Sequence, residues 1–128
     1  MSSIDFASLG ISAPVLKAVQ QLGYEQPTPV QAQCIPILLN GQNLLGTAQT
    51  GTGKTASFTL PMIEILSGGR ARMRMPRSLV LAPTRELAEQ IHEALSQLGK
   101  QSGLRSVTVY GGVGINPQIS KLKRGVEI

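Results

Sequence analysis

The sequence predicts an α/β fold, a parallel sheet with flanking helices, on two observations. Short apolar segments alternate along the chain with segments of helical periodicity, the order expected of parallel strands joined by helical crossovers. A turn rich in glycine or proline follows three of the apolar segments. Because ligands of such sheets bind at the carboxyl ends of the strands, the turns at 49–54, 83–84 and 111–112 are expected to share one edge.

Two helices are expected in the first third of the chain. The first spans 13–22, with Ser12 as its N-cap and Gly23 where a C-terminal glycine belongs. The second spans 29–39 and begins on a proline, which suits the first helical position. Pro36 is expected to break or kink this helix, because proline removes a backbone N–H.

The remainder of the chain alternates between expected strands and helices. The expected strands are 43–48, 78–82, 105–110 and 126–128, the last being the first half of a strand. The expected helices are 53–66, 84–100 and 116–123, with a loop over 67–76. The helix over 84–100 has the clearest pattern, with leucines and isoleucine repeating along one face.

Composition limits the class of protein. The 128 residues fit one domain at most, and 41% hydrophobic with 15% charged residues is a globular composition. The single cysteine, Cys34, excludes an intramolecular disulfide and favours a core position in a reducing, cytoplasmic protein. No apolar run approaches the ~20 residues of a membrane span, so we expect no membrane partner. The net charge of +5 favours a negatively charged binding partner.

Residues 48–55, AQTGTGKT, have the pattern of a phosphate-binding P-loop, with Ala48 where glycine is usual. Gly51 and Gly53 permit positive φ, so that successive N–H groups can surround a phosphate at a helix N-terminus. Lys54 would supply a charge to the β- and γ-phosphates, and Thr55 a hydroxyl to Mg²⁺. A merely flexible glycine loop is the alternative.

A second group of residues lies around the start of the second helix. The Gln31 carboxamide can accept from adenine N6 and donate to N7, which would favour ATP over GTP, and Tyr24 can stack on the base. From the residues alone, a helix start with a solvent-facing Gln31 is the more common arrangement, so both interpretations stay open.

Together these segments resemble the DEAD-box ATP-dependent RNA helicases, and most closely their bacterial members. Four motifs occur in the order and spacing of that family and cover the whole chain. They are the Q motif at 23–31, motif I at 48–55, motif Ia at 83–88 (PTRELA) and the GG motif at 111–112. Phe6 lies 17 residues before Gly23, where the family has an isolated aromatic residue.

The resemblance implies a P-loop NTPase domain with a RecA-like parallel sheet, here truncated, and a role for each motif residue. It implies a Q-motif region at 1–33 and an incomplete ATP-binding domain at 34–128. The residues implied for ATP and Mg²⁺ are Phe6, Tyr24, Gln31, Gln49, Thr50, Gly51, Thr52, Gly53, Lys54 and Thr55. Of these, Lys54 and Thr55 are also the implied catalytic residues, and Thr55 is the implied metal ligand. The residues implied for the RNA sugar–phosphate backbone are Pro83, Thr84, Arg85, Gly111 and Gly112. Such contacts would not read base sequence.

The chain also departs from the family. The Asp-Glu-Ala-Asp, Ser-Ala-Thr and Thr-Pro-Gly-Arg motifs are absent, and Asp5 is the only aspartate. We therefore expect the parent protein to unwind RNA with ATP, and this chain to bind adenine nucleotide, and RNA weakly, without turnover. The alternatives are a non-catalytic nucleotide- or RNA-binding product and another P-loop NTPase, such as a small-molecule kinase.

The remaining charged candidates have simpler explanations. Arg85 can pair with Glu89 on a solvated helix face instead of meeting RNA. The cluster of Arg70, Arg72, Arg74 and Arg77 can add non-specific RNA affinity, but a solvated loop is the more common outcome. His92 lies on the polar side of its helix and is not expected to be catalytic.

Overall fold

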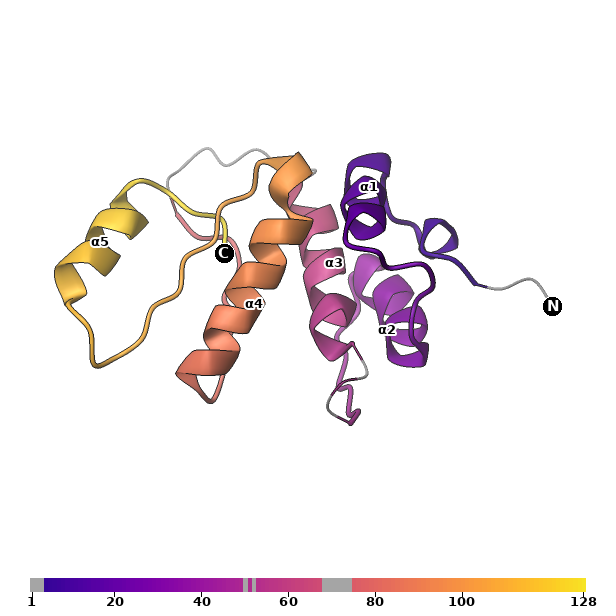
Figure 1. The fold of residues 1–128 in the computed structure, drawn as a ribbon, viewed down its shortest axis with the longest axis horizontal. Helices are drawn as coiled ribbons and strands as arrows, with labels where there is room; N and C mark the ends of the chain where they lie inside the picture. Colours follow the sequence, from indigo (N-terminus) through magenta and orange to yellow (C-terminus); the bar gives the residue numbers. More distant parts are fainter. Residues whose placement is uncertain (1–3, 50, 52, 68–74) are drawn as a thin grey trace.

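The fold is a row of packed helices connected by irregular segments, seen in a computed structural model that describes residues 4–49, 51, 53–67 and 75–128. The elements are the short 3-10 helices η1 (Ala7–Leu9) and η2 (Lys100–Ser102) and the α-helices α1 (Ala13–Gln21), α2 (Pro29–Leu39), α3 (Lys54–Ser67), α4 (Arg85–Leu98) and α5 (Ile115–Lys123). Helix α3 is central, packed against α1, α2 and α4. Figure 1 shows that α5 lies apart from these packed helices and that irregular segments connect it to the rest of the chain at both of its ends.

Helix α1 confirms the prediction, but its start is held by a distant residue. Ser12 occupies the N-cap position in extended backbone, and its side chain makes no capping bond within the helix. Its N–H and its hydroxyl instead both donate to the Glu64 carboxylate of α3, at 2.9 Å each. A carboxylate at a helix N-terminus offsets the positive end of the helix dipole, so α3 caps α1 while packing beside it.

Helix α2 begins with a reciprocal capping box. The Gln31 N–H donates to Thr28 Oγ1 at 3.4 Å, and the Thr28 N–H donates to Gln31 Oε1 at 3.0 Å. The helix runs through Pro36 to Leu39, so an outright break at this proline was wrong. Ile35, beside the proline, is fully buried in the core, and packing of this helix against α3 offsets the lost hydrogen bond.

The predicted helices after the glycine-rich loop are confirmed with shifted ends. Helix α4 begins after Thr84, whose side chain accepts from the Leu87 N–H at 3.2 Å, and stops at Leu98, because Gly99 leads into η2. The loop expected after α3 falls largely on residues 68–74, so Arg70, Arg72 and Arg74 lie outside the described residues. Arg77 has a structural role: its guanidinium donates to the Leu66 carbonyl oxygen at 2.8 Å and caps the end of α3.

The core lies between the four packed helices and includes one face of an extended segment. Val15, Val19, Ile35, Leu60, Ile63 and Leu98 are almost completely buried. In the segment 78–82, Val80 and Ala82 pack against this core, whereas Leu79 and Leu81 are 80% and 84% exposed. This alternation is that of a strand with only one face covered.

The expected parallel sheet is not confirmed, because none of the described residues is assigned to a strand. What remains of it is a partial ladder around the segment 126–128. The backbone carbonyl oxygen of Glu127 accepts from the N–H groups of Arg77 and Ser78, and the Glu127 N–H donates to the backbone carbonyl oxygen of Arg105 at 3.0 Å. The Val107 N–H donates to the backbone carbonyl oxygen of Ile128 at 3.1 Å. A three-residue segment gives its neighbours too few partners for a regular ladder, and 43–48 makes no backbone bond of this kind within the described residues.

An uncovered apolar face accompanies this incomplete pairing. The accessible surface is 8713 Å², whereas a compact monomer of 13.6 kDa should expose about 6,600 Å². Leu45, in another of the expected strands, is 94% exposed. The boundary expected between residues 33 and 34 falls inside α2, so no break in the fold marks it.

Candidate functional site

A cavity of about 530 Å³ lies where the segment 23–31 meets the glycine-rich loop and the start of α3. Its lining residues are Gly23, Tyr24, Glu25, Gln26, Thr28, Gln31, Gly51, Gly53, Thr55 and Ala56. Its volume is within the range of small-molecule and cofactor sites. Two segments predicted separately from the sequence therefore form the walls of one cavity.

Gln31 connects these two walls. Its side chain is only 5% exposed, so the solvent-facing alternative is wrong in this structure. Its Oε1 accepts from the Thr28 N–H at 3.0 Å, and its Nε2 donates to the Gly53 carbonyl oxygen at 3.2 Å. A carboxamide has two N–H donors and two acceptor lone pairs. One donor and one acceptor site therefore remain after these two bonds.

The glycine-rich loop has the backbone expected of a phosphate-binding loop at both described glycines. Gly51 has φ +85° and Gly53 φ +83°, a region that residues with a side chain rarely adopt. A Cβ at Gly53 would collide with the Gln31 amide and crowd Thr28 Oγ1, whereas a Cβ at Gly51 would meet nothing. A side chain at position 53 would therefore be strained by its positive φ and would also displace the Gln31 amide. Thr50 and Thr52 lie outside the described residues.

The first turn of α3 supplies the polar groups at this end of the cavity. Lys54 is the first residue of the helix and is exposed, and Thr55 is half-buried and lines the cavity. The helix N-terminus gives this end of the cavity a partial positive charge, which favours an anion. A hydroxyl oxygen is also a ligand type that Mg²⁺ accepts. The residues present therefore fit a nucleotide phosphate with its metal.

Tyr24 and Phe6 form an aromatic pair at the other end of the cavity. Their ring centroids are 6.5 Å apart and the ring planes are inclined by 25°. Tyr24 is exposed and lines the cavity, whereas Phe6 is buried and is not part of the lining. Phe6 thus supports Tyr24 from behind. Gln49 is exposed at the entry to the glycine-rich loop and does not line the cavity either.

A second group of predicted residues meets at the start of α4. Arg85 donates from Nη2 to the Gly111 carbonyl oxygen at 2.7 Å, and a Cβ at Gly112 (φ +81°) would collide with the same guanidinium. The structure therefore brings together Arg85, Gly111 and Gly112. The alternative pairing of Arg85 with Glu89 is not present as an ion pair. Pro83 and Thr84 precede Arg85 and are exposed.

Sequence reasoning missed Tyr110 as a neighbour of this arginine, and it considered Glu89 only as an ion-pair partner of Arg85. Arg85 lies 4.9 Å over the ring of Tyr110, and Glu89 accepts from Thr108 Oγ1 at 3.1 Å. The hydrogen bond between the Tyr110 hydroxyl and Glu89 lowers the pKa of that carboxyl and raises the pKa of the phenol. Their positions offered a signal, because Tyr110 directly precedes the glycine pair and Glu89 lies one helical turn after Arg85.

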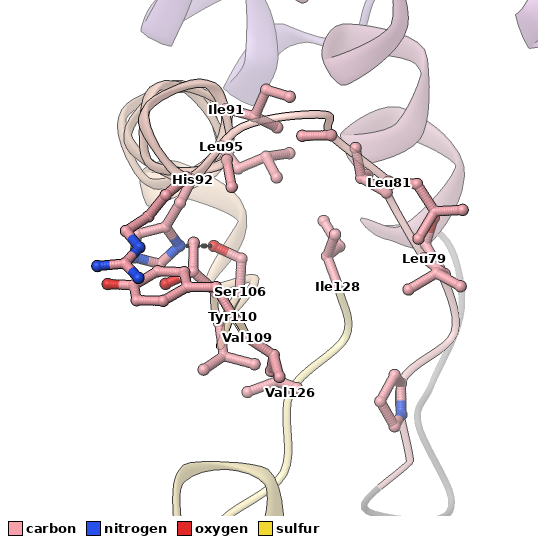
Figure 2. A pocket seen from close by; sticks show the side chains of 18 of the residues that line it. Leu79, Leu81, Ile91, His92, Leu95, Ser106, Val109, Tyr110, Val126 and Ile128 are labelled. Carbon is pink, nitrogen blue, oxygen red and sulfur yellow. Dashed lines mark hydrogen bonds between the residues drawn. The ribbon is translucent and has the colours of Figure 1, made fainter. Parts of the chain in front are cut away.

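A larger cavity of about 670 Å³ opens beside this group, between α4 and the extended segments (Figure 2). Its lining is largely apolar and includes Leu79, Leu81 and Ile128, with Tyr110 at one side. His92 Nδ1 and Ser106 Oγ are 2.8 Å apart there, which assigns the histidine a local structural partner. None of the residues implied for nucleotide lines this cavity, whereas Pro83, Thr84, Arg85 and Gly111 of the second group do.

The described part of the chain offers neither a membrane-spanning helix nor a cluster of metal-ligating side chains. No helix there is long and apolar enough to cross a membrane. No group of three or more His, Cys, Asp or Glu side chains within those residues could hold a metal ion.

Comparisons with known proteins agree on one family. The family model described as DEAD/DEAH box helicase matches residues 28–128. The ATP-dependent RNA helicase DeaD of Escherichia coli (strain K12) is 49% identical over 124 residues, which are 96% of this chain and 19% of that protein. The human probable ATP-dependent RNA helicase DDX46 is 46% identical over 121 residues, 93% of this chain and 12% of that protein. The chain thus spans at most about a fifth of these relatives.

Two solved structures share the fold. The RNA helicase Prp28 from Chaetomium thermophilum, bound to ADP, matches with a TM-score of 0.89 and 37% identity over 97% of this chain and 31% of that chain. A DEAD box protein from Methanococcus jannaschii matches with a TM-score of 0.88 and 36% identity over 99% of this chain and 34% of that chain.

Proposed function

The chain belongs to the DEAD/DEAH box helicase family, and from this premise we propose that it is the adenine-nucleotide-binding part of an ATP-dependent RNA helicase. The observation that supports this proposal best is the single cavity shared by Gln31 and the glycine-rich loop. A base and a phosphate chain can be held together only if both recognition elements face the same space, and the shared lining of this cavity supports such an arrangement.

We propose that the segment 23–31 is a Q motif and that it recognises adenine. The donor and acceptor that remain on the Gln31 carboxamide match adenine N7 and N6–H₂. Guanine presents an acceptor, O6, in place of N6–H₂, so the same contact would fail with GTP. Tyr24, exposed in the cavity and backed by Phe6, would stack on the base.

Phosphate recognition falls to the loop 49–55 and the start of α3. The amides beside Gly51 and Gly53, the α3 N-terminus and the Lys54 ammonium would hold the phosphates. Thr55 would hold Mg²⁺, which when bound neutralises charge on the phosphates. Thr50, Thr52 and Gln49 complete the proposed set. Lys54 and Thr55 are the residues on which hydrolysis in the parent helicase would depend.

RNA contact falls to the second group, Pro83, Thr84, Arg85, Gly111 and Gly112. Arginine, a threonine hydroxyl and backbone N–H groups beside glycine bind phosphate and sugar without reading the bases. We therefore propose sequence-independent binding that weakens steeply with salt. The exposure of Arg85 and of both glycines supports this role.

The remaining parts of the proposal concern the whole protein. We propose that the extended segments belong to a RecA-like parallel sheet, with 1–33 as the Q-motif region and 34–128 as part of the ATP-binding domain. The strand-like burial pattern of 78–82 supports the sheet. A cytoplasmic location is also proposed, supported by the buried single cysteine, Cys34.

A second candidate function, nucleotide binding without turnover, applies to the 128 residues by themselves. Asp5 is the only aspartate, and its Oδ1 accepts from the Ser8 N–H at 2.9 Å, beside η1. It does not line the nucleotide cavity. The described residues therefore offer no aspartate at the phosphate end of the cavity to position a metal.

Amide hydrogen exchange tests the proposed joint site. With Mg²⁺ and ADP present, amides of 23–31 and of 51–57 should be protected together, because base and phosphates engage both walls at once. The Lys54→Ala variant should show much weaker protection of both segments at the same ADP concentration. Protection of 51–57 without any change in 23–31 would contradict the proposal.

A further inference from the structure

We propose that Tyr110 is a positioning residue for Arg85: its ring holds the guanidinium against the Gly111–Gly112 turn, so that the two proposed RNA-contacting turns act as one phosphate-binding site. This inference rests on the proposed RNA contact of Arg85. It adds a residue that lies in neither of the motifs assigned to RNA above.

The geometry fixes the Arg85 guanidinium from two sides. Its Cζ lies 4.9 Å from the centroid of the Tyr110 ring, within the range of a cation–π contact. Its Nη2 donates to the Gly111 carbonyl oxygen at 2.7 Å. A guanidinium has five N–H donors, so donors remain for a phosphate after this one bond. The side chain is thereby directed along the Gly111–Gly112 turn although it is exposed.

Tyr110 is itself held more firmly than an ordinary surface tyrosine. The Gln118 side chain of α5 accepts from the Tyr110 N–H at 3.1 Å and donates to the Tyr110 carbonyl oxygen at 3.2 Å and to Gly114 at 3.1 Å. On the other side, the ring lies against Arg85 of α4, and Glu89 of the same helix accepts from Thr108 Oγ1 at 3.1 Å. Tyr110 is therefore tied to α4 and α5 at once.

A lysine could not replace Arg85 in this arrangement. The planar guanidinium can lie flat on a ring and still present donors at its edge, whereas an ammonium is a compact charge on a flexible stem. An unrestrained arginine would lose side-chain freedom when it meets RNA. Prior positioning by Tyr110 reduces that loss, so removal of the ring should weaken RNA binding even though Tyr110 need not touch RNA.

The test measures binding of a fluorescent oligouridine to the 128-residue chain by anisotropy over a range of salt concentrations. The variants are Tyr110→Leu, Tyr110→Phe, Gln118→Ala, Arg85→Ala and the double variant of Tyr110→Leu with Arg85→Ala. Lys17→Ala, which removes one exposed charge from α1, is the control. Thermal unfolding of each variant is recorded alongside.

We expect Tyr110→Leu to weaken binding about three- to fivefold, the size of an exposed cation–π contact, and Tyr110→Phe to restore most of the affinity. In the Arg85→Ala background the Tyr110→Leu change should cost nothing further. Arg85→Ala should flatten the slope of log affinity against log salt by about 0.7, one phosphate contact on a single strand. Gln118→Ala, which releases the Tyr110 backbone but leaves ring and guanidinium intact, should give a smaller loss in the same direction.

The outcomes separate two kinds of failure. If Arg85→Ala binds oligouridine as the unmodified chain does, the proposed RNA contact is wrong. If Arg85→Ala weakens binding but Tyr110→Leu does not, or if Tyr110→Leu costs as much with Arg85 absent as with it present, the positioning role is wrong. The ring-current shift of the Arg85 side-chain NMR signals, lost in Tyr110→Leu and kept in Tyr110→Phe, checks the contact without RNA.

Discussion

The side-chain amide of Gln31 donates to the backbone carbonyl oxygen of Gly53 at 3.2 Å, across 22 positions of sequence. The same side chain closes the capping box at the start of α2. Gln31 therefore joins the start of α2 to the glycine-rich loop, and it lines the cavity between them. A substitution at Gly53 should therefore displace the Gln31 amide and weaken the proposed adenine contact.

Substitution of Gly53 by alanine tests this connection. Gly53→Ala should abolish measurable ADP binding and lower the melting temperature, because the new methyl group would displace the Gln31 amide. Gly51→Ala is a matched control: it has the same positive φ, with a strain of about 1–2 kcal/mol, but open space around the new group. Equal effects of the two variants on ADP affinity would contradict the role given to the Gln31–Gly53 bond.

The Tyr110–Glu89 hydrogen bond predicts a measurable titration. Tyr110 and Tyr24 are the only tyrosines, so in a Tyr24→Phe background the phenolate absorbance reports Tyr110 alone. The bond to Glu89, followed by the charge of that carboxylate, raises the pKa of Tyr110 above 10.0. Glu89→Gln should therefore lower the observed phenol pKa. A phenol pKa that is unchanged by Glu89→Gln would show that the bond does not form.

The interaction between Tyr110 and Glu89 should stabilise the folded chain only within a limited range of pH. The raised pKa of Tyr110 gives stability that is present below about pH 10 and is lost as pH rises through the folded-state pKa. The lowered pKa of Glu89 gives stability that is present above about pH 4.5 and is lost as pH falls through its folded-state pKa. Unfolding midpoints of the chain and of Glu89→Gln should differ most between these limits.

The uncovered apolar face predicts self-association. Leu45, Leu79 and Leu81 are largely exposed, and the segments around them have backbone groups available to another strand. Sedimentation velocity over a hundredfold range of concentration should show species larger than 13.6 kDa, and Leu79→Lys with Leu81→Lys should shift the distribution toward monomer. A single monomeric species at every concentration would contradict this expectation.

Local signals were sufficient to predict the helices. Caps and terminators act within a few residues of sequence: Pro29 begins α2 as expected, and Gly23 has the positive φ expected of a C-terminal glycine, whereas Thr84 caps α4 instead of being its first residue. The positive φ of Gly51 and Gly53 could be predicted for the same reason, since the loop pattern is itself local. Pro36 shows the limit of this reasoning, because tertiary packing of α2 outweighs the local preference of proline to end a helix.

Contacts between distant residues could not be predicted in this way. The Glu64 carboxylate that caps α1 lies 52 positions from Ser12, and nothing in either segment specifies the other. Strand pairing is non-local as well: the continuous apolar run of 78–82 predicted a buried strand, but it indicated neither that Leu79 and Leu81 would be exposed nor how far the ladder extends. At the candidate site, the sequence indicated Arg85 and Gly111, but the contact of the Tyr110 ring with the Arg85 guanidinium was not predicted.

Turnover of ATP by these 128 residues is not expected. The glycine-rich loop, Lys54 and Thr55 would bind the phosphates in the ground state, whereas catalysis needs interactions that strengthen in the transition state. An arginine finger alone contributes about 10³–10⁵ in rate to P-loop NTPases, and none of the arginines in the described part of the chain lines the nucleotide cavity.

A phosphate-release assay measures this directly. Release should equal that of Lys54→Ala, which controls for contaminating ATPases, with and without added RNA. Release above this control that rises with RNA would show that another residue replaces the missing carboxylate.

Calorimetric titration with ADP and with GDP tests the central claim, that the segment 23–31 and the glycine-rich loop form one adenine-selective site. The bidentate contact of Gln31 predicts tighter binding of ADP by about 1–3 kcal/mol. Gln31→Ala should erase this preference, whereas Gln26→Ala, a change in another glutamine of the same cavity lining, should preserve it. Equal affinities of the unmodified chain for ADP and GDP, or an ADP preference that survives Gln31→Ala, would contradict the account.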